Sequence, residues 1–180
     1  MLRVSVVGNS GSGKSTLARA LAARLRVPYV ELDSIHHQPN WQPLPATELR
    51  ARVDTVTANG GWVVDGNYSA VRDLVWRRAD TVVWVDPDRH TVMRQVVWRT
   101  LRRAGLRAEL WNGNRERWGN FFATTPDESV IVWAWQRHSV YRARYLAASA
   151  DPAWSHLTFV RINSRAAARR LVAEATGPES

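Results

Sequence analysis

The 180-residue sequence has no cysteine, and Lys14 is the only lysine among 25 Lys and Arg residues. Without cysteine, disulfides and thiolate metal sites are excluded. There is no apolar run of about 18 residues, which argues against a transmembrane helix, and the N-terminus lacks the pattern of a secretory signal. We therefore expect a cytoplasmic protein without membrane association. The length favours a single domain over residues 1–180.

The charge is strongly unbalanced, with a formal net charge of +9 at pH 7. Such an excess is compatible with nucleic-acid binding. The arginines, however, are spread along the chain and are not collected in one tail, and arginines also serve small phosphorylated ligands. Nucleic acid is therefore a possible but not a favoured partner. The sequence leaves open whether the protein is a monomer or a dimer.

The first 25 residues combine three patterns in a fixed order. A β-branched run (2–7) predicts a buried strand, a glycine-rich segment (8–13) predicts a tight loop, and leucines spaced by four predict a helix over 14–25. This is the context that the phosphate-binding P-loop motif G-x-x-x-x-G-K-[ST] requires. The predicted nucleotide-binding residues are Gly8, Asn9, Ser10, Gly11, Ser12, Gly13, Lys14, Ser15 and Thr16.

Each residue type in the motif has a physical role. The glycines allow backbone N–H groups to turn toward a phosphate, and the helix N-terminus adds partial positive charge. Lys14 is predicted to reach the β- and γ-phosphates of ATP, and the Ser15 hydroxyl to bind Mg²⁺. A compact ammonium on a flexible stem suits this loop better than a broad guanidinium. This difference explains why an arginine-rich chain has a lysine here.

The remaining sequence alternates between strand and helix patterns. We expect strands over 27–33, 62–66, 80–86 and 156–162, and helices over 46–60, 68–79, 88–104, 128–150 and 164–175. Within the expected helix 128–150, the segment VIVWAW by itself could also form a strand. This alternation predicts the α/β, three-layer fold of P-loop NTPases, in which helices cover both faces of a five-stranded parallel sheet.

Three aspartates follow predicted strands, at the edge of the sheet where ligands bind. Asp65 is the candidate for holding Mg²⁺ on the strand next to the P-loop strand, although an Asp-Gly turn is the alternative. Asp33 could orient or deprotonate an acceptor hydroxyl, or it could cap the following segment. Asp86 fits an ordinary turn between a strand and a helix.

The sequence resembles the adenylate-kinase-like P-loop kinases, and in particular the small "topology modulation" proteins among the nucleoside-monophosphate-kinase-like group. The similar stretches are GNSGSGKST, ELDSIHHQPNW, WVVDGNYS, DTVVWVDPDRHTVMRQVVWRTLRR and TFVRINS. The resemblance implies a kinase that uses ATP and Mg²⁺. It also implies an acceptor-binding segment near 34–60 and a small lid near 105–127.

The resemblance assigns further roles by position. It places Arg94 over the adenine, Arg99 and Arg137 at the phosphates, and Tyr141 one turn after Arg137. Adenylate kinases have an arginine that binds the nucleoside monophosphate after the Asp-Gly that ends the third strand. The matching position here is Ser69, so AMP is not expected to be the usual acceptor.

The acceptor side is the least determined part of the sequence. Asp33 and His36 form a D-x-x-H pattern, and gluconate and shikimate kinases have an acidic residue there that contacts the acceptor hydroxyl. His36 and His37 could also bind a metal, but no third ligand is evident. Trp41 could stack on a ring or simply fill space. In the predicted lid, Arg115 and Arg117 are candidates for contacting phosphate or for solvated surface charge.

Two classes of function follow from these patterns. The first is a kinase that transfers the γ-phosphate of Mg-ATP to a small nucleotide or another hydroxyl-bearing acceptor. The second is a P-loop module that binds nucleic acid or a protein partner and uses nucleotide as a switch. A kinase that acts on a nucleic-acid end is a further alternative, because the excess of positive charge would suit it. A guanine-reading Asn-Lys-x-Asp motif would need a second lysine, so a switch GTPase is excluded.

Overall fold

The computed structural model of the chain describes residues 1–105, 112 and 130–176, and for 99–105 and 130–134 it gives the backbone only. Five strands form one parallel sheet in the order β2-β3-β1-β4-β5. The strands are β1 (Arg3–Gly8), β2 (Tyr29–Glu31), β3 (Trp62–Asp65), β4 (Thr81–Val85) and β5 (Thr158–Ile162). The predicted α/β class with a five-stranded parallel sheet is confirmed.

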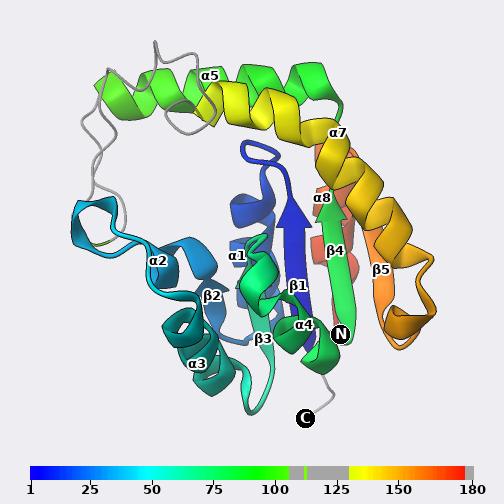
Figure 1. Ribbon diagram of the computed structural model, residues 1–180. Helices are drawn as coiled ribbons and strands as arrows, with labels where there is room; N and C mark the ends of the chain where they lie inside the picture. Colours follow the sequence, from blue (N-terminus) through cyan, green and yellow to red (C-terminus); the bar gives the residue numbers. More distant parts are fainter. Residues whose placement is uncertain (106–111, 113–129, 177–180) are drawn as a thin grey trace.

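Helices cover both faces of this sheet (Figure 1). On one face lie α1 (Lys14–Leu25) and α8 (Arg165–Glu174), and on the other lie α3 (Ala46–Thr57), α4 (Ser69–Arg78) and α7 (Val130–Ser149). The long α5 (Arg89–Gly105) packs against α7 above the carboxyl ends of the strands. The short elements are α2 (Leu32–His36), η1 (Pro39–Trp41) and η3 (Pro152–Trp154).

The core forms because each strand points alternate side chains to opposite faces. On β1, Val4 and Val6 pack toward α1 and α8, whereas Val7 packs toward α4 and α7. The second face also buries the indole rings of Trp62 and Trp76. Their Nε1–H groups donate to the Thr57 carbonyl (3.3 Å) and to Ser5 Oγ (3.2 Å), so these rings are buried without losing a hydrogen bond.

The structure corrects the predicted second strand. β2 is only Tyr29–Glu31, and Leu32 already begins α2. The Leu32 side chain is buried and fills the space beside Gly66, where a Cβ would lie 2.9 Å from Leu32 Cβ. Asp33 therefore lies in the first turn of α2 and not at the end of a strand. The segment VIVWAW belongs to α7, which settles that ambiguity in favour of the helix.

Candidate functional site

The loop between β1 and α1 has the backbone conformation that the motif predicts. Gly8, Gly11 and Gly13 all have positive φ angles (151°, 75° and 92°). A Cβ at Gly8 would collide with the Val85 carbonyl oxygen, and a Cβ at Gly11 would collide with the Val96 side chain. The loop is thus held closely between β4 and α5, and the glycines are needed for both conformation and space.

The next residues, Lys14 and Ser15, open α1 at the carboxyl end of the sheet and are half-buried. They face Asp65, the last residue of β3, which is only 2% exposed. Burial raises the pKa of the Asp65 carboxyl, and the nearby Lys14 ammonium and Ser15 hydroxyl oppose that rise. The structure therefore brings together the predicted phosphate-binding lysine and both predicted metal ligands.

One oxygen of Asp65 remains unsatisfied. Asp65 Oδ1 is buried and has no hydrogen-bond partner in the described part of the chain. Buried polar atoms in proteins nearly always have a partner. Carboxylate and hydroxyl oxygens are ligands that Mg²⁺ accepts, so Asp65 and Ser15 fit a magnesium ion.

The other oxygen of the same carboxylate is held by a residue that the sequence did not single out. The Tyr29 hydroxyl, from β2, donates to Asp65 Oδ2 at 3.0 Å. Burial raises the pKa of Tyr29, and the Asp65 charge raises it further, so the phenol remains a donor. The ring also lies under the Arg19 guanidinium, 5.1 Å from the ring centroid. Tyr29 thus fixes the Asp65 carboxylate in one orientation.

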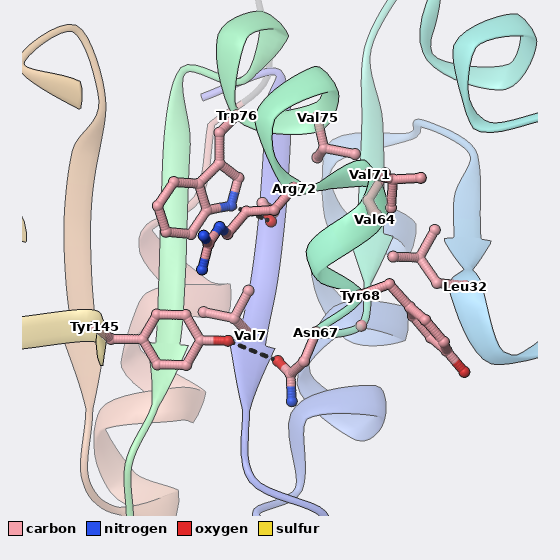
Figure 2. Close-up of a pocket in the computed structure, with 12 residues that line it drawn as sticks. Val7, Leu32, Val64, Asn67, Tyr68, Val71, Arg72, Val75, Trp76 and Tyr145 are labelled. Atoms are coloured by element: carbon pink, nitrogen blue, oxygen red, sulfur yellow. Dashed lines mark hydrogen bonds between the residues drawn. The ribbon is translucent and has the colours of Figure 1, made fainter. Parts of the chain in front are cut away.

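The start of the P-loop is held by a second residue that was missed. The Asn67 side chain accepts a hydrogen bond from Gly8 N (3.0 Å) and donates one to Gly8 O (2.5 Å). The Tyr145 hydroxyl, from α7, donates to Asn67 Oδ1 at 3.0 Å and so fixes the orientation of the amide (Figure 2). Both backbone groups of the first motif glycine are therefore satisfied by one side chain.

Asp33 lies in the same neighbourhood. Burial is the main cause of the raised pKa of Asp65, and the charge of Asp33 adds to it, so the two carboxylates interact electrostatically. Asp33 Oδ1 accepts a hydrogen bond of 2.7 Å from the Tyr68 hydroxyl. The capping alternative is not supported, because the N-cap of α2 is Glu31 and no side chain caps it. The Asp33 carboxylate is oriented from outside its own helix.

Tyr68, the partner of Asp33, begins a row of four rings that contact one another. The His36 ring lies 4.6 Å from the Tyr68 ring and 5.0 Å from the His37 ring, and Trp41 lies 5.4 Å from His37 (centroid distances). Burial lowers the pKa of His36, and His37 adds to this effect. The nearby Asp33 charge opposes this shift, and the net effect favours the neutral imidazole. Trp41, which is 39% exposed, forms the outer edge of the group.

The metal alternative for these histidines gains no support. Among residues 1–105, 112 and 130–176, no three His, Cys, Asp or Glu side chains are grouped so as to hold a metal ion. As for the membrane, none of the helices in these ranges is both long and apolar enough to span one.

The predicted lid over 105–127 lies almost entirely outside the described residues, and so do Arg115 and Arg117. Asn112 is described, and its Nδ2 donates to the carbonyl oxygens of His37 (2.5 Å) and Ser34 (3.3 Å). Asn112 therefore contacts the beginning of the predicted acceptor segment.

The three arginines assigned by resemblance are only partly described. Arg94 is exposed on α5, close in sequence to Val96, which touches the P-loop. Arg99 lies on the same helix, but its side chain is outside the description. Arg137 is half-buried on α7. Their contacts with a nucleotide remain predictions.

Asp86 has a larger structural role than the turn that the sequence indicated. Its carboxylate is buried and accepts two hydrogen bonds from Arg161 of β5, from Nε (3.0 Å) and Nη2 (2.5 Å). Arg142 Nε of α7 lies 3.6 Å away. Asp86 therefore ties the end of β4 to β5 and α7.

The sequence contained a partial indication of the site residues that the sequence patterns did not single out. Asn67 and Tyr68 belong to the DGNY stretch that carried the family resemblance, but nothing in the sequence paired them with Gly8 and Asp33. Tyr29 had no signal beyond its place in a predicted strand, because its partner Asp65 is 36 residues away.

No protein-family model matches the chain. Among curated proteins, it is similar to shikimate kinase from Nitrobacter winogradskyi, with 30% identity over 108 residues. The match covers 52% of this chain and 50% of the relative, so it spans about half the length of that protein.

Two solved structures share the fold over nearly the whole chain. Shikimate kinase from Bacteroides thetaiotaomicron has a TM-score of 0.51 and 16% identity, covering 96% of this chain and 94% of that one. Shikimate kinase from Acinetobacter baumannii, in complex with shikimate, has a TM-score of 0.56 and 16% identity, covering 97% and 90%. The likeness expected from the sequence was to the "topology modulation" proteins, and that subgroup remains a prediction. The described chain has the P-loop fold of the shikimate kinases.

Proposed function

We propose that the protein is an ATP-dependent phosphotransferase that moves the γ-phosphate of Mg-ATP to a hydroxyl group of a small acceptor. The observation that carries this proposal is the grouping of Lys14, Ser15, Asp65 and Asp33 at the carboxyl end of the sheet. The partial sequence similarity to a shikimate kinase and the shared fold support the same class of reaction.

The donor side of the reaction follows from the P-loop. Its backbone N–H groups and Lys14 would bind the phosphates, because both supply positive charge where the γ-phosphate leaves. Ser15 and Asp65 would hold the magnesium ion, which neutralises charge on the phosphate oxygens. Tyr29 would keep the Asp65 carboxylate turned toward that ion, since it occupies the other carboxylate oxygen.

The acceptor side is proposed to centre on Asp33. An acceptor hydroxyl next to this carboxylate could pass its proton to Asp33 as its oxygen attacks the γ-phosphorus, and ADP would leave. The Tyr68 hydroxyl holds one carboxylate oxygen in place for this step. Gluconate and shikimate are acceptors of this hydroxyl-bearing kind, whereas AMP is a weaker candidate because Ser69 occupies the position of the usual arginine.

An acceptor screen tests the proposal. ADP release from Mg-ATP is measured with shikimate, gluconate, AMP and a 5′-hydroxyl oligonucleotide, each against a sample without acceptor. We expect clear stimulation by a small hydroxyl compound and weak or no turnover with AMP. Turnover of tens per second with AMP, within the usual range for kinases, would instead make this an adenylate kinase. Stimulation by the oligonucleotide alone would favour nucleic acid as the acceptor. Absence of any ADP or ATP binding would refute the proposed function.

The Asn67 clamp gives a separate prediction about nucleotide binding. Asn67→Asp replaces the amide N–H donor to Gly8 O by an oxygen, which would repel that carbonyl. We expect ADP to bind about tenfold more weakly, corresponding to the loss of one partly buried hydrogen bond of ~1–2 kcal/mol. Calorimetric titration with Mg-ADP measures this change. Asn59→Asp, at an exposed position after α3, is the control and should bind ADP like the wild type. Equal affinity in both variants would contradict the role given to Asn67.

A further inference from the structure

The three residues that follow β3 contact both sides of the proposed site. Residues 66–68 come directly after Asp65, and each of them has a specific contact with the P-loop or with α2. We call these three residues the 66–68 bridge. Because they are consecutive, a shift at one of the contacts is passed to the other two with little slack in between.

Gly66 attaches the bridge to the sheet and to the start of α2. Its N–H donates to the Val6 carbonyl of β1 at 3.2 Å. Its φ angle is 147°, and its backbone lies so close to Leu32 that a Cβ would be 2.9 Å from Leu32 Cβ. Leu32 is buried and immediately precedes Asp33. The bridge therefore cannot move away from α2 without opening a gap in the core.

Asn67 attaches the bridge to the donor side. Its amide binds both backbone groups of Gly8, the N–H at 3.0 Å and the carbonyl at 2.5 Å. The Tyr145 hydroxyl holds the amide in the orientation that these two bonds need. A phosphate that draws the N–H groups of the P-loop toward itself would therefore act on a loop whose first glycine is fixed to Asn67.

Tyr68 attaches the bridge to the acceptor side. Its hydroxyl donates to Asp33 Oδ1 at 2.7 Å, and its ring lies 4.6 Å from the His36 ring of the same helix. Burial and the Asp33 charge raise the pKa of Tyr68, so the phenol remains a donor. In Figure 2 the Asn67 and Tyr68 side chains point in opposite directions. One of them therefore reaches the P-loop and the other reaches α2.

We propose that Asn67 and Tyr68 are positioning residues that couple the two sides of the site, so that nucleotide bound at the P-loop stabilises the placement of Asp33. The helix α2 has only five residues, too few to be stable without tertiary contacts. When bound phosphates restrain Gly8, they restrain the bridge as well, and α2 should open less often. This inference rests on the proposed function, because it takes the P-loop as the nucleotide site and Asp33 as part of the acceptor side.

Hydrogen–deuterium exchange of backbone amides tests this coupling. Exchange is followed by mass spectrometry in the presence and absence of saturating Mg-ADP. Three peptides are compared: the P-loop, residues 32–37, which cover α2, and residues 151–157, which include η3 and precede β5. The last peptide is the internal control, because it lies at the amino end of the parallel strands, opposite the P-loop.

Two variants break the bridge at its two ends. Tyr68→Phe removes the hydrogen bond to the acceptor side and keeps the ring, whereas Asn67→Asp removes the donor to the P-loop carbonyl. Tyr29→Phe is the matched control. It makes the same change in a hydroxyl that binds Asp65, the residue before the bridge.

In the wild type, we expect Mg-ADP to slow exchange in α2 by at least about fivefold, the lower end of typical coupling between two sites, and to leave residues 151–157 unchanged. In Tyr68→Phe, Mg-ADP should still protect the P-loop, but α2 should no longer respond. Asn67→Asp, saturated at a higher Mg-ADP concentration, should also lose the response of α2, and Tyr29→Phe should retain it. If Tyr68 served only the stability of α2, its loss would speed exchange by the same factor with and without Mg-ADP.

Three results would overturn the inference: no response of α2 in the wild type, an unchanged response in Tyr68→Phe, or an equal loss of response in Tyr29→Phe. Should Tyr68→Phe not fold, the wild type and Asn67→Asp decide the question. Calorimetric titration with Mg-ADP precedes each experiment and separates this failure from a failure of the proposed function. If ADP binds and α2 does not respond, only the coupling is refuted. If ADP does not bind, the phosphotransferase proposal itself fails.

Discussion

Lys14→Ala is expected to lower phosphoryl transfer by at least about 100-fold, the usual cost of removing one group that stabilises charge in a transition state. Lys14 is half-buried at the start of α1 and faces Asp65, away from both hydrophobic clusters. Its removal should therefore change the melting temperature by less than about 2 °C. ADP release and thermal unfolding measured on the same preparation check both parts of this prediction.

The matched control is Arg24→Ala, an exposed residue at the other end of the same helix. It removes one positive charge from α1 and should retain wild-type activity. Lys14→Arg keeps the charge but replaces a compact ammonium by a broad fork, and we expect it to be nearly as inactive as Lys14→Ala. An active arginine variant would show that the single lysine is not explained by geometry. Full activity of Lys14→Ala would contradict the phosphotransferase proposal.

Asp33→Asn is expected to abolish transfer to the acceptor while leaving the donor side intact. Loss of a general base typically costs about 10²- to 10⁴-fold in rate. The amide has the same size as the carboxylate and can still accept the hydrogen bond from Tyr68. ADP affinity and the slow hydrolysis of ATP without acceptor should therefore remain close to the wild-type values. Steady-state rates with and without the acceptor found in the screen measure this difference.

Tyr68→Phe is the companion variant, because it removes the hydrogen bond to Asp33 but leaves the carboxylate. We expect a smaller loss of transfer, about tenfold, as for one hydrogen bond to a charged group. If Asp33 served only the structure of α2, then Asp33→Asn would lower the melting temperature and reduce ADP binding and transfer together. Such a joint loss, or an acceptor rate that stays at the wild-type value, would remove Asp33 from the chemistry.

Much of the fold could be predicted because its signals are local. The glycine spacing of residues 8–13 marks a loop, and the β-branched runs mark buried parallel strands, independently of anything distant in the chain. The ends of helices and strands were harder to predict where a contact with a residue distant in the sequence sets them. β2 ends at Glu31 because the next residue, Leu32, fills the space beside Gly66. This contact joins the segment that follows β2 to the segment that follows β3.

The sequence by itself determined the order of the elements and the P-loop, and it predicted the donor-side residues Lys14, Ser15 and Asp65, because a motif and the ends of predicted strands mark their positions. Only the tertiary structure decided which other side chains orient the site residues by hydrogen bonds. The hydrogen bonds from Tyr29 to Asp65, Tyr68 to Asp33 and Asn67 to Gly8 join residues 36, 35 and 59 positions apart. Such pairings depend on how strands and helices pack, and a one-dimensional pattern carries no information about which distant groups will meet or remain without a partner.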